Sequence, residues 1–165
     1  MSSATDVSYR VPLIPQPTDV SCWAACAAML LSWKRQERVH PRDLFERSRL
    51  NATLNWNDVG TYERLGFAVE RALTCRESGA FVKLMRKHGP VMVDYVNSRD
   101  ASGKPTGSHL VVVDAVQNGV ARIKDPLPVT KGREYWVSLT NVLRALDQNA
   151  DKAAAYYTRD IVYLK

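Results

Sequence analysis

The chain contains three cysteines, Cys22, Cys26 and Cys75, which are its strongest candidate nucleophiles. A cysteine attacks a carbonyl as the thiolate, and the thiol pKa of ~8.5 falls at a helix N-terminus or beside an imidazolium. Cys22 follows a proline-rich segment and begins an apolar stretch of helical periodicity, so free backbone N–H groups and the positive end of the helix dipole should surround it. Cys26 lies one turn deeper, where burial keeps a thiol inert, and Cys75 is a lone thiol near an expected loop. We therefore predict that Cys22 is the nucleophile.

A cysteine nucleophile needs a base, and three histidines are available. His40 stands in a charged stretch at a helix start, and His88 ends an expected helix before a Gly-Pro pair, so both are typical of surface histidines. His109 opens a strongly apolar, β-branched segment directly after a glycine-containing loop. Such a ring is either a hydrogen-bonded core histidine or a catalytic base. We predict that His109 is the catalytic base, because strand pairing should bring a carboxylate close to its ring.

That residue is Asp125, which ends the segment returning from a turn at residues 117–119. A hairpin centred on this turn places His109 opposite a residue near position 127, within two positions of Asp125. A carboxylate there would hold the imidazole in one tautomer. An aspartate before Pro126 is also common as a simple turn residue, but together with His109 the catalytic interpretation is favoured.

Acyl transfer also needs N–H donors for the developing oxyanion. Gln16 lies six residues before Cys22. We predict that the Gln16 amide and the backbone N–H of Cys22 converge on one point and form the oxyanion hole.

The elements that must position these residues follow from hydrophobic periodicity and turn signals. Ser21 or Asp19 is expected to cap the nucleophile helix. Helices should fill the first half and strands the second, which predicts an α+β, papain-like fold with an N-terminal helical lobe packed on a C-terminal antiparallel β-sheet. We expect helices at 22–36, 41–48, 58–65, 79–88 and 140–146, a loop at 99–108, and extended segments at 67–73, 91–96, 109–116, 120–125, 133–139 and 154–164.

The four candidate residues, in the order Gln16, Cys22, His109 and Asp125, resemble the catalytic residues of papain-like cysteine peptidases. QPTDVSCW is similar to the family's glutamine, six-residue step, cysteine and aromatic signature, and GPVMVDY followed by GSHLVVVDAV resembles the family's histidine strand and the strand before it. Over most of its length the chain is most similar to short bacterial members, namely the staphopain-like proteases and the avirulence-type proteases that pathogens inject into host cells. The resemblance implies a Cys-His-Asp triad with a glutamine in the oxyanion hole.

Three features depart from papain itself. The third triad position is Asp125, where papain has asparagine. Cys22 and His109 are 87 residues apart, against about 130–150 in the larger enzymes, so loops around the substrate cleft must be shorter. The run before the cysteine is Asp-Val-Ser and lacks the family's glycine. The resemblance therefore does not define substrate specificity.

Composition excludes several classes of protein. The 165 residues suit one domain, placed at 1–165 with residues 1–10 flexible. The net charge is +6, but basic and acidic residues alternate along expected helix faces, which favours solvated surfaces over a nucleic-acid patch. No apolar run approaches the ~20 residues that cross a bilayer, and the start lacks the pattern of a secretory signal. Three cysteines argue against a disulfide framework. We expect a monomer that binds neither nucleic acid nor membrane.

The leading hypothesis is hydrolysis of a peptide bond in a protein substrate, with no cofactor and no metal. A transglutaminase or deamidase would use the same chemistry on glutamine side chains and release ammonia. A structural metal module of Cys22, Cys26, Cys75 and His109 is disfavoured because the spacing lacks a CxxC pair. A non-catalytic domain with a basic binding face remains a third class, in which Cys22 would not react with a thiol-selective epoxide.

The same features bear on the cellular role. Reduced cysteines and a single small domain fit a cytoplasmic enzyme. They fit equally a bacterial effector or toxin that a secretion system translocates into a target cell, and in that case we expect an immunity or inhibitor protein in the producing cell. No segment of useful length precedes Val11, so a long inhibitory propeptide is not expected in this chain.

Overall fold

The computed structural model describes residues 6–48, 59–71, 77–103, 105–150 and 160–165, and its fold is α+β, as predicted. Among these residues, seven antiparallel strands form one sheet. The helices are α1 (Cys22–Arg35), α2 (Pro41–Ser48), α3 (Val59–Arg64), α4 (Ser78–His88) and α5 (Leu139–Ala150). The strands are β1 (Val7–Ser8), β2 (Phe67–Arg71), β3 (Val91–Arg99), β4 (Pro105–Gln117), β5 (Val120–Asp125), β6 (Arg133–Ser138) and β7 (Asp160–Leu164).

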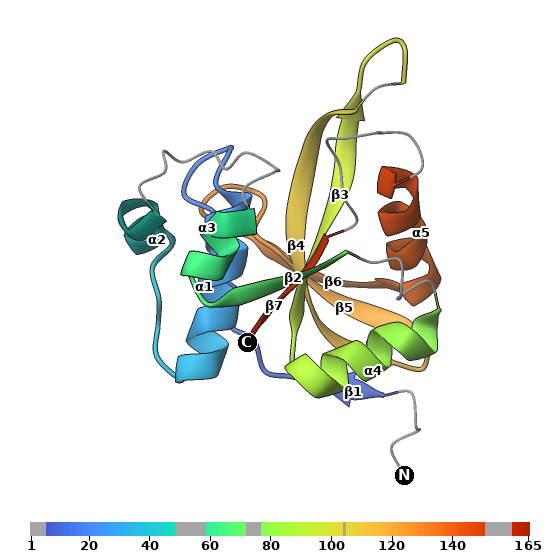
Figure 1. Ribbon diagram of the computed structural model, residues 1–165, viewed down its shortest axis with the longest axis horizontal. Helices are drawn as coiled ribbons and strands as arrows, with labels where there is room; N and C mark the ends of the chain where they lie inside the picture. The colour runs from blue at the N-terminus through green and yellow to red at the C-terminus, as the bar shows by residue number, and fades with distance from the viewer. Residues whose placement is uncertain (1–5, 49–58, 72–76, 104, 151–159) are drawn as a thin grey trace.

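The sheet lies between two layers of helices. Its strand order is β2-β7-β3-β4-β5-β6, with β1 paired to β4 outside this path. Figure 1 shows α1, α2 and α3 on one side of the sheet and α4 and α5 on the other. One buried core joins α1 to the sheet, and a second joins α4 and α5 to its opposite face. The predicted helical lobe is therefore confirmed, and two further helices cover the far face of the sheet.

Helix α1 runs through the core, as its apolar sequence predicts. Every residue from Trp23 to Ser32 is buried, and the many alanines allow close approach to the sheet. Ser21 occupies the N-cap position, but its hydroxyl bonds Thr18 and caps no helix amide. The expected Ser21 side-chain cap is therefore wrong, and this hydroxyl leaves the leading N–H groups of α1 uncapped. At the other end Gln36 adopts the left-handed conformation that ends many helices (φ 56°).

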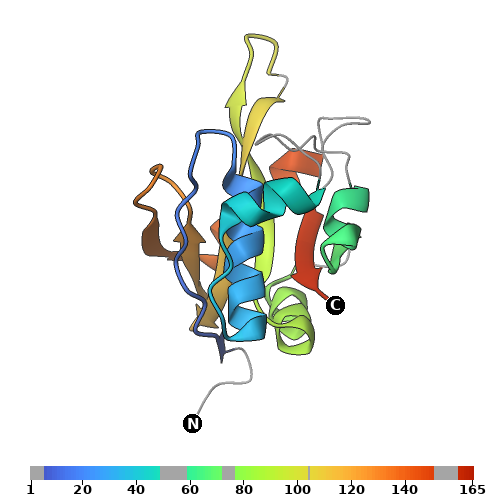
Figure 2. The ribbon, with the colours of Figure 1, turned by 90° about the vertical axis from the view of Figure 1, so that its left-hand side faces the viewer.

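The lead-in to α1 is fastened to the sheet. Residues 1–5 of the segment expected to be flexible lie outside the described residues, but Val7 and Ser8 pair with the end of β4 as strand β1. The chain then runs alongside α1 before turning into it (Figure 2). Val7 and Ser8, which fall within the range expected to be flexible, are therefore paired with the sheet.

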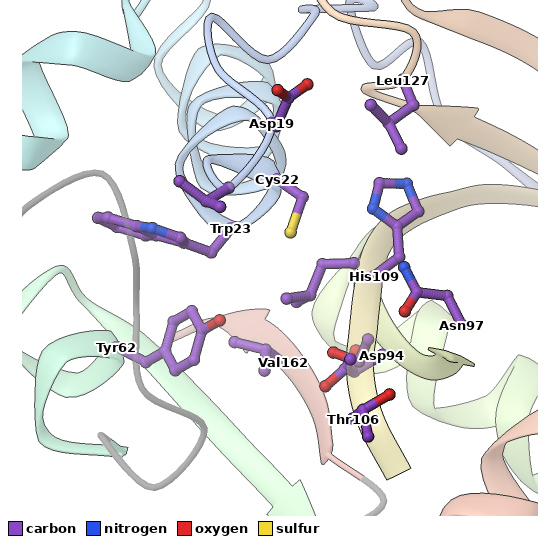
Figure 3. Close-up of a pocket in the computed structure, with 14 residues that line it drawn as sticks. Asp19, Cys22, Trp23, Tyr62, Asp94, Asn97, Thr106, His109, Leu127 and Val162 are labelled. Carbon is purple, nitrogen blue, oxygen red and sulfur yellow. The ribbon is translucent and has the colours of Figure 1, made fainter. Parts of the chain in front are cut away.

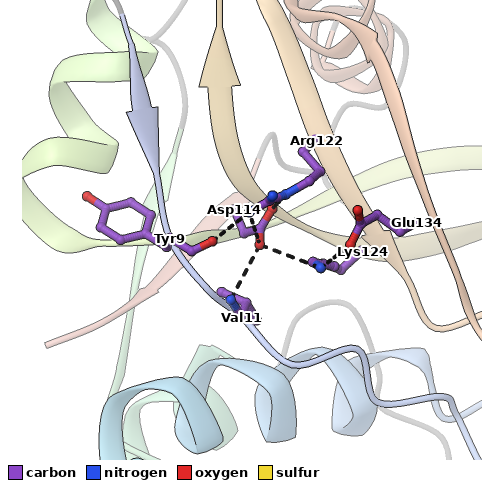
Figure 4. A network of polar contacts seen from close by, with 6 residues as sticks. All are labelled: Tyr9, Val11, Asp114, Arg122, Lys124 and Glu134. Carbon is purple, nitrogen blue, oxygen red and sulfur yellow. Dashed lines mark hydrogen bonds and ion pairs between the residues drawn. The ribbon is translucent and has the colours of Figure 1, made fainter. Parts of the chain in front are cut away.

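A charged cluster centred on Asp114 holds this lead-in (Figure 4). The Asp114 side chain is fully buried and accepts hydrogen bonds from Arg122 Nε (2.7 Å) and from the backbone N–H of Val11 (3.4 Å). Arg122 also donates to the carbonyl of Tyr9 (2.6 Å). Lys124 lies 3.9 Å from Asp114 and pairs with Glu134. The buried carboxylate of Asp114 thus connects the lead-in with β4 and β5, and Lys124 extends the cluster to β6.

Strands β4 and β5 form the predicted hairpin. Asn118 and Gly119 both have positive φ (50° and 75°), as a two-residue type I′ turn requires. Val112 lies opposite Lys124, a register that, continued, sets His109 opposite position 127. The expected loop at 99–108 is shorter, because β3 and β4 continue pairing as far as Arg99 and Pro105. The resulting hairpin projects beyond the body of the protein in Figure 1.

The remaining boundaries agree closely with the predicted ranges. Helix α5 extends past the expected end at 146, to Ala150. The first part of the last predicted strand, 154–159, lies outside the described residues. Within the described part of the chain, no helix has the length and apolar character needed to cross a membrane.

Candidate active site

The predicted nucleophile and base come together where α1 begins. Cys22 is the first residue of α1 and is half-buried, whereas His109 lies in β4 and is 3% exposed. The Cys22 sulfur and the His109 ring point toward one another (Figure 3), and the interaction with Cys22 is one of the causes that raise the pKa of His109. One turn further along α1, Cys26 Sγ donates to the carbonyl oxygen of Leu110 (3.3 Å). This contact fixes α1 against β4 next to His109, so the helix N-terminus is aligned with the imidazole.

Asp125 lies on the other side of the imidazole. His109 Nε2 is 2.6 Å from Asp125 Oδ1, which leaves Nδ1 to face Cys22. The Asp125 side chain is fully buried. The backbone N–H of Leu127 donates to Oδ1 (2.9 Å), and Arg133 donates to Oδ2. The carboxylate is therefore fixed on both oxygens.

These contacts determine the charges of the pair. Burial lowers the pKa of the His109 imidazole, but hydrogen bonds to Asp125 and Cys22 outweigh this effect and raise that pKa to about 9. Burial raises the pKa of Asp125, yet the hydrogen bonds from His109, Leu127 and Arg133 hold it below the ordinary value. At neutral pH these shifts favour a protonated His109 and an ionised Asp125, with the Cys22 sulfur on the other side of the imidazolium.

Gln16, the predicted oxyanion donor, is held by the loop that follows Asp125. Its side chain is fully buried, and its Nε2 donates to the carbonyl of Thr18 (2.7 Å). Its backbone is held on both sides by the loop after Asp125, with Gln16 N donating to Pro126 O (3.1 Å) and Thr130 N donating to Gln16 O (3.0 Å). An amide nitrogen carries two N–H groups, so the bond to Thr18 leaves one for another acceptor. Gln16 is not among the residues that line the cavity at Cys22.

Cys26, the rival nucleophile, is fully buried. Burial, together with negative charge at Cys22, Asp125 and Asp94, raises the pKa of the Cys26 thiol well above its ordinary value. A neutral thiol inside the core is a poor nucleophile. Cys75 lies outside the described residues.

A cavity of about 310 Å³ opens beside the pair. Figure 3 shows the Cys22 sulfur directed into this space, with the His109 ring on one wall. Its other walls come from α1, α3, the β3–β4 hairpin and β7. They include Trp23, Tyr62, Asp94, Asn97, Thr106 and Val162.

Most of these lining residues were not singled out by the sequence. Tyr62, Asn97 and Val162 belong to three separate elements, and no spacing along the chain connects them with Cys22. Trp23 is the exception, because it directly follows the nucleophile. The other histidines lie elsewhere: His40 is exposed, and His88 stacks on Tyr163 with ring centroids 3.9 Å apart.

The described residues contain no group of three histidine, cysteine or acidic side chains arranged to hold a metal ion. What the site does contain suits acyl transfer. A sulfur and an imidazole in contact can exchange a proton, and the oriented imidazole can pass that proton to a leaving group.

Three solved structures share this fold. A double glycine motif protease from an AMS/PCAT transporter, in complex with a leader peptide, is 17% identical with a TM-score of 0.56, and the match covers 96% of this chain and 94% of that one. The peptidase domain of Streptococcus ComA is 19% identical with a TM-score of 0.56, covering 94% and 98%. A C39-like peptidase from Bacillus anthracis is 18% identical with a TM-score of 0.62, covering 94% and 95%. At these identities the likeness concerns the fold.

Sequence comparison gives a more specific relationship. No curated protein sequence matches this chain. Residues 1–144, however, match the family described as papain-like cysteine protease AvrRpt2, peptidase family C70. Because this match spans most of its length, the chain belongs to the AvrRpt2 family of papain-like cysteine proteases.

Proposed function

We propose that this chain hydrolyses peptide bonds of a protein substrate through Cys22, His109 and Asp125. The observation that carries the proposal is the position of His109, which faces the Cys22 sulfur on one side (Figure 3) and hydrogen-bonds Asp125 on the other. Cys22 also opens onto a cavity large enough for a segment of substrate.

The reaction has two stages. The Cys22 thiolate attacks the scissile carbonyl carbon, the bond to nitrogen breaks, and the His109 imidazolium donates its proton to the departing amine. This leaves a thioester on Cys22 and a neutral imidazole. His109 then accepts a proton from a water molecule as it attacks the thioester, which releases the carboxylic acid and regenerates the pair. Asp125 fixes the tautomer and compensates the imidazolium charge throughout.

The oxyanion would be stabilised by the N-terminus of α1. The backbone N–H of Cys22 is one donor, and the free N–H of the Gln16 amide is the second. Gln16 would reach the oxyanion through the hydrogen that does not bond Thr18. The backbone hydrogen bonds that Gln16 donates to Pro126 O and accepts from Thr130 N would keep this donor in place as the charge develops.

A protein is the substrate class that fits best. The cavity is lined by residues of α1 and of the β3–β4 hairpin, including Trp23 and Asn97. One protein of the same fold was solved in complex with a leader peptide, which supports a peptide substrate. Transglutaminase-like or deamidase action uses the same triad and is the alternative that the experiment below must separate.

The role of a bacterial effector or toxin, delivered into a target cell and restrained in the producer by an immunity protein, is part of the proposal. Membership of the AvrRpt2 family supports it, as do the small size and the free thiols of Cys22 and Cys26. A tagged chain recovered from the cytosol of co-cultured target cells would support delivery, and retention in the producer under all conditions would argue against it.

The test of the activity compares the wild type with Cys22→Ala in a cell lysate. New protein N-termini are identified by mass spectrometry, and ammonia is assayed in parallel. We expect new termini that require Cys22. Ammonia release without new termini would replace the protease with a deamidase or transglutaminase. Neither product, together with no labelling of Cys22 by a thiol-selective epoxide, would indicate a binding domain.

A further inference from the structure

We propose that Arg133 is a positioning residue of the catalytic site, which holds the Asp125 carboxylate in the orientation that His109 needs. The inference rests on the proposed function. Sequence analysis assigned no role to Arg133, which lies 24 residues beyond His109 on a different strand.

The contact is built into the sheet. Arg133 begins β6 directly opposite Asp125, the last residue of β5. Its Nε donates to Asp125 Oδ2 at 2.9 Å, and its Nη2 lies 2.8 Å from the same oxygen. Two N–H groups of the guanidinium therefore converge on Oδ2. Oδ1 faces His109 and the backbone N–H of Leu127, so both oxygens of the carboxylate are held.

Asp125 needs such a partner because it carries a fully buried charge. A buried carboxylate is costly unless it is both paired and hydrogen-bonded. The Arg133 side chain is 59% exposed, so this cation balances Asp125 while remaining largely hydrated itself. The guanidinium also lies over the Tyr135 ring, 5.3 Å from its centroid, which limits the directions in which it can move.

The same ion pair closes the loop that contacts Gln16. Asp125 and Arg133 stand at the two ends of residues 126–132, and this loop accepts a hydrogen bond from Gln16 N and donates one to Gln16 O. Arg133 is therefore placed to affect both the triad and the proposed oxyanion donor.

A purely structural role is the competing explanation, because Arg133 also joins β5 to β6. The two roles differ in what they predict for His109. The titratable groups around Asp125 are His109 on β4, Cys22 and Cys26 on α1, and Tyr135 on β6. If Arg133 is a positioning residue, its loss should change the pH dependence of Cys22 reactivity. If its role is purely structural, its loss should change only the free energy of unfolding.

The experiment measures alkylation of Cys22 by iodoacetamide between pH 4 and 10, with the labelled peptide quantified by mass spectrometry. The variants are Arg133→Met and Arg133→Lys. The matched control for loss of one positive charge is Arg144→Met, at an exposed position of α5. For Arg133→Met we expect a roughly tenfold lower rate at pH 7. The pH at which alkylation becomes rapid should rise in Arg133→Met, because a less firmly oriented Asp125 gives less support to the imidazolium that stabilises the Cys22 thiolate.

Arg133→Lys keeps the positive charge but loses one of the two N–H contacts with Asp125 Oδ2. Its alkylation rate should therefore fall between those of the wild type and Arg133→Met. Arg144→Met should match the wild type. An unchanged pH profile in Arg133→Met, with or without a lower melting temperature, would overturn the proposal. If Arg133→Met fails to fold, a wild-type rate in Arg133→Lys overturns it instead. A wild-type Cys22 that reacts no faster than free glutathione below pH 7 would refute the proposed function itself, which keeps the two failures distinct.

Discussion

The substitution Asp125→Asn tests the central contact of the site. Asparagine keeps the shape of the side chain and removes its charge. In the wild type, burial lowers the pKa of His109, and hydrogen bonds to Asp125 and Cys22 raise it to about 9. Without the carboxylate the imidazole keeps only the Cys22 contact to oppose its burial. We therefore expect the pKa of His109 to fall.

The size of the effect follows from the shift. A change from the ordinary histidine value of about 6.5 to about 9 corresponds to roughly 3.5 kcal/mol at about 1.4 kcal/mol per pH unit. If Asp125 supplies at least half of this shift, its loss lowers the pKa of His109 by more than one unit. The protonated fraction of His109 at pH 8 then decreases from about nine-tenths to about a third or less. Loss of tautomer control would lower kcat further, since the same exchange in a serine-protease triad costs about 10⁴-fold.

The assay follows iodoacetamide alkylation of Cys22 and hydrolysis of a substrate identified in the lysate experiment, each from pH 5 to 10. The direction of the pH effect follows from the raised pKa of His109, because this imidazole loses its proton only as pH rises through about 9. Alkylation needs only the thiolate and therefore reports the acid edge. The alkaline edge of hydrolysis, where His109 loses the proton that the leaving amine needs, should move at least one unit toward lower pH in Asp125→Asn. Asp100→Asn, on the hairpin tip, is the control and should leave it in place. An alkaline edge that stays near pH 9 in Asp125→Asn would refute our account of how His109 is held.

Three further substitutions test neighbouring contacts. Gln16→Ala should lower kcat for peptide hydrolysis by roughly 10²–10³-fold and leave Cys22 alkylation unchanged; equal loss in both assays would contradict its role as oxyanion donor. Cys26→Ala should retain hydrolysis within about twofold and lose about 1 kcal/mol of stability in urea unfolding, because one buried hydrogen bond disappears; an inactive but folded variant would argue against an inert thiol. Asp114→Ala should lower the unfolding free energy by about 3 kcal/mol, because Arg122 loses its buried counter-charge, and a change within experimental error would show that the cluster does not fasten the lead-in.

The sequence predicted the order and type of the elements well where local signals are strong. The apolar run of α1, the Asn-Gly turn of the β4–β5 hairpin and the β-branched strands are short-range patterns, and their boundaries agree with the structure within a few residues. The prediction that Ser21 caps α1 is wrong, because its hydroxyl bonds Thr18 instead. The pairing of Val7 and Ser8 with β4 was not predicted. Both contacts depend on neighbours that the local sequence does not specify.

The chemistry available to this protein can be read from its residues: a thiol at a helix start, an imidazole at a strand start, and a carboxylate one hairpin away, whose separation follows from turn geometry. How these groups are supported is visible only in the folded chain. Arg133 on Asp125, Asn97 and Tyr62 around the cavity, and the loop that holds Gln16 come from elements far apart in the chain. Their proximity results from burying the two faces of one sheet, and long-range packing of that kind leaves no periodic signal in the sequence.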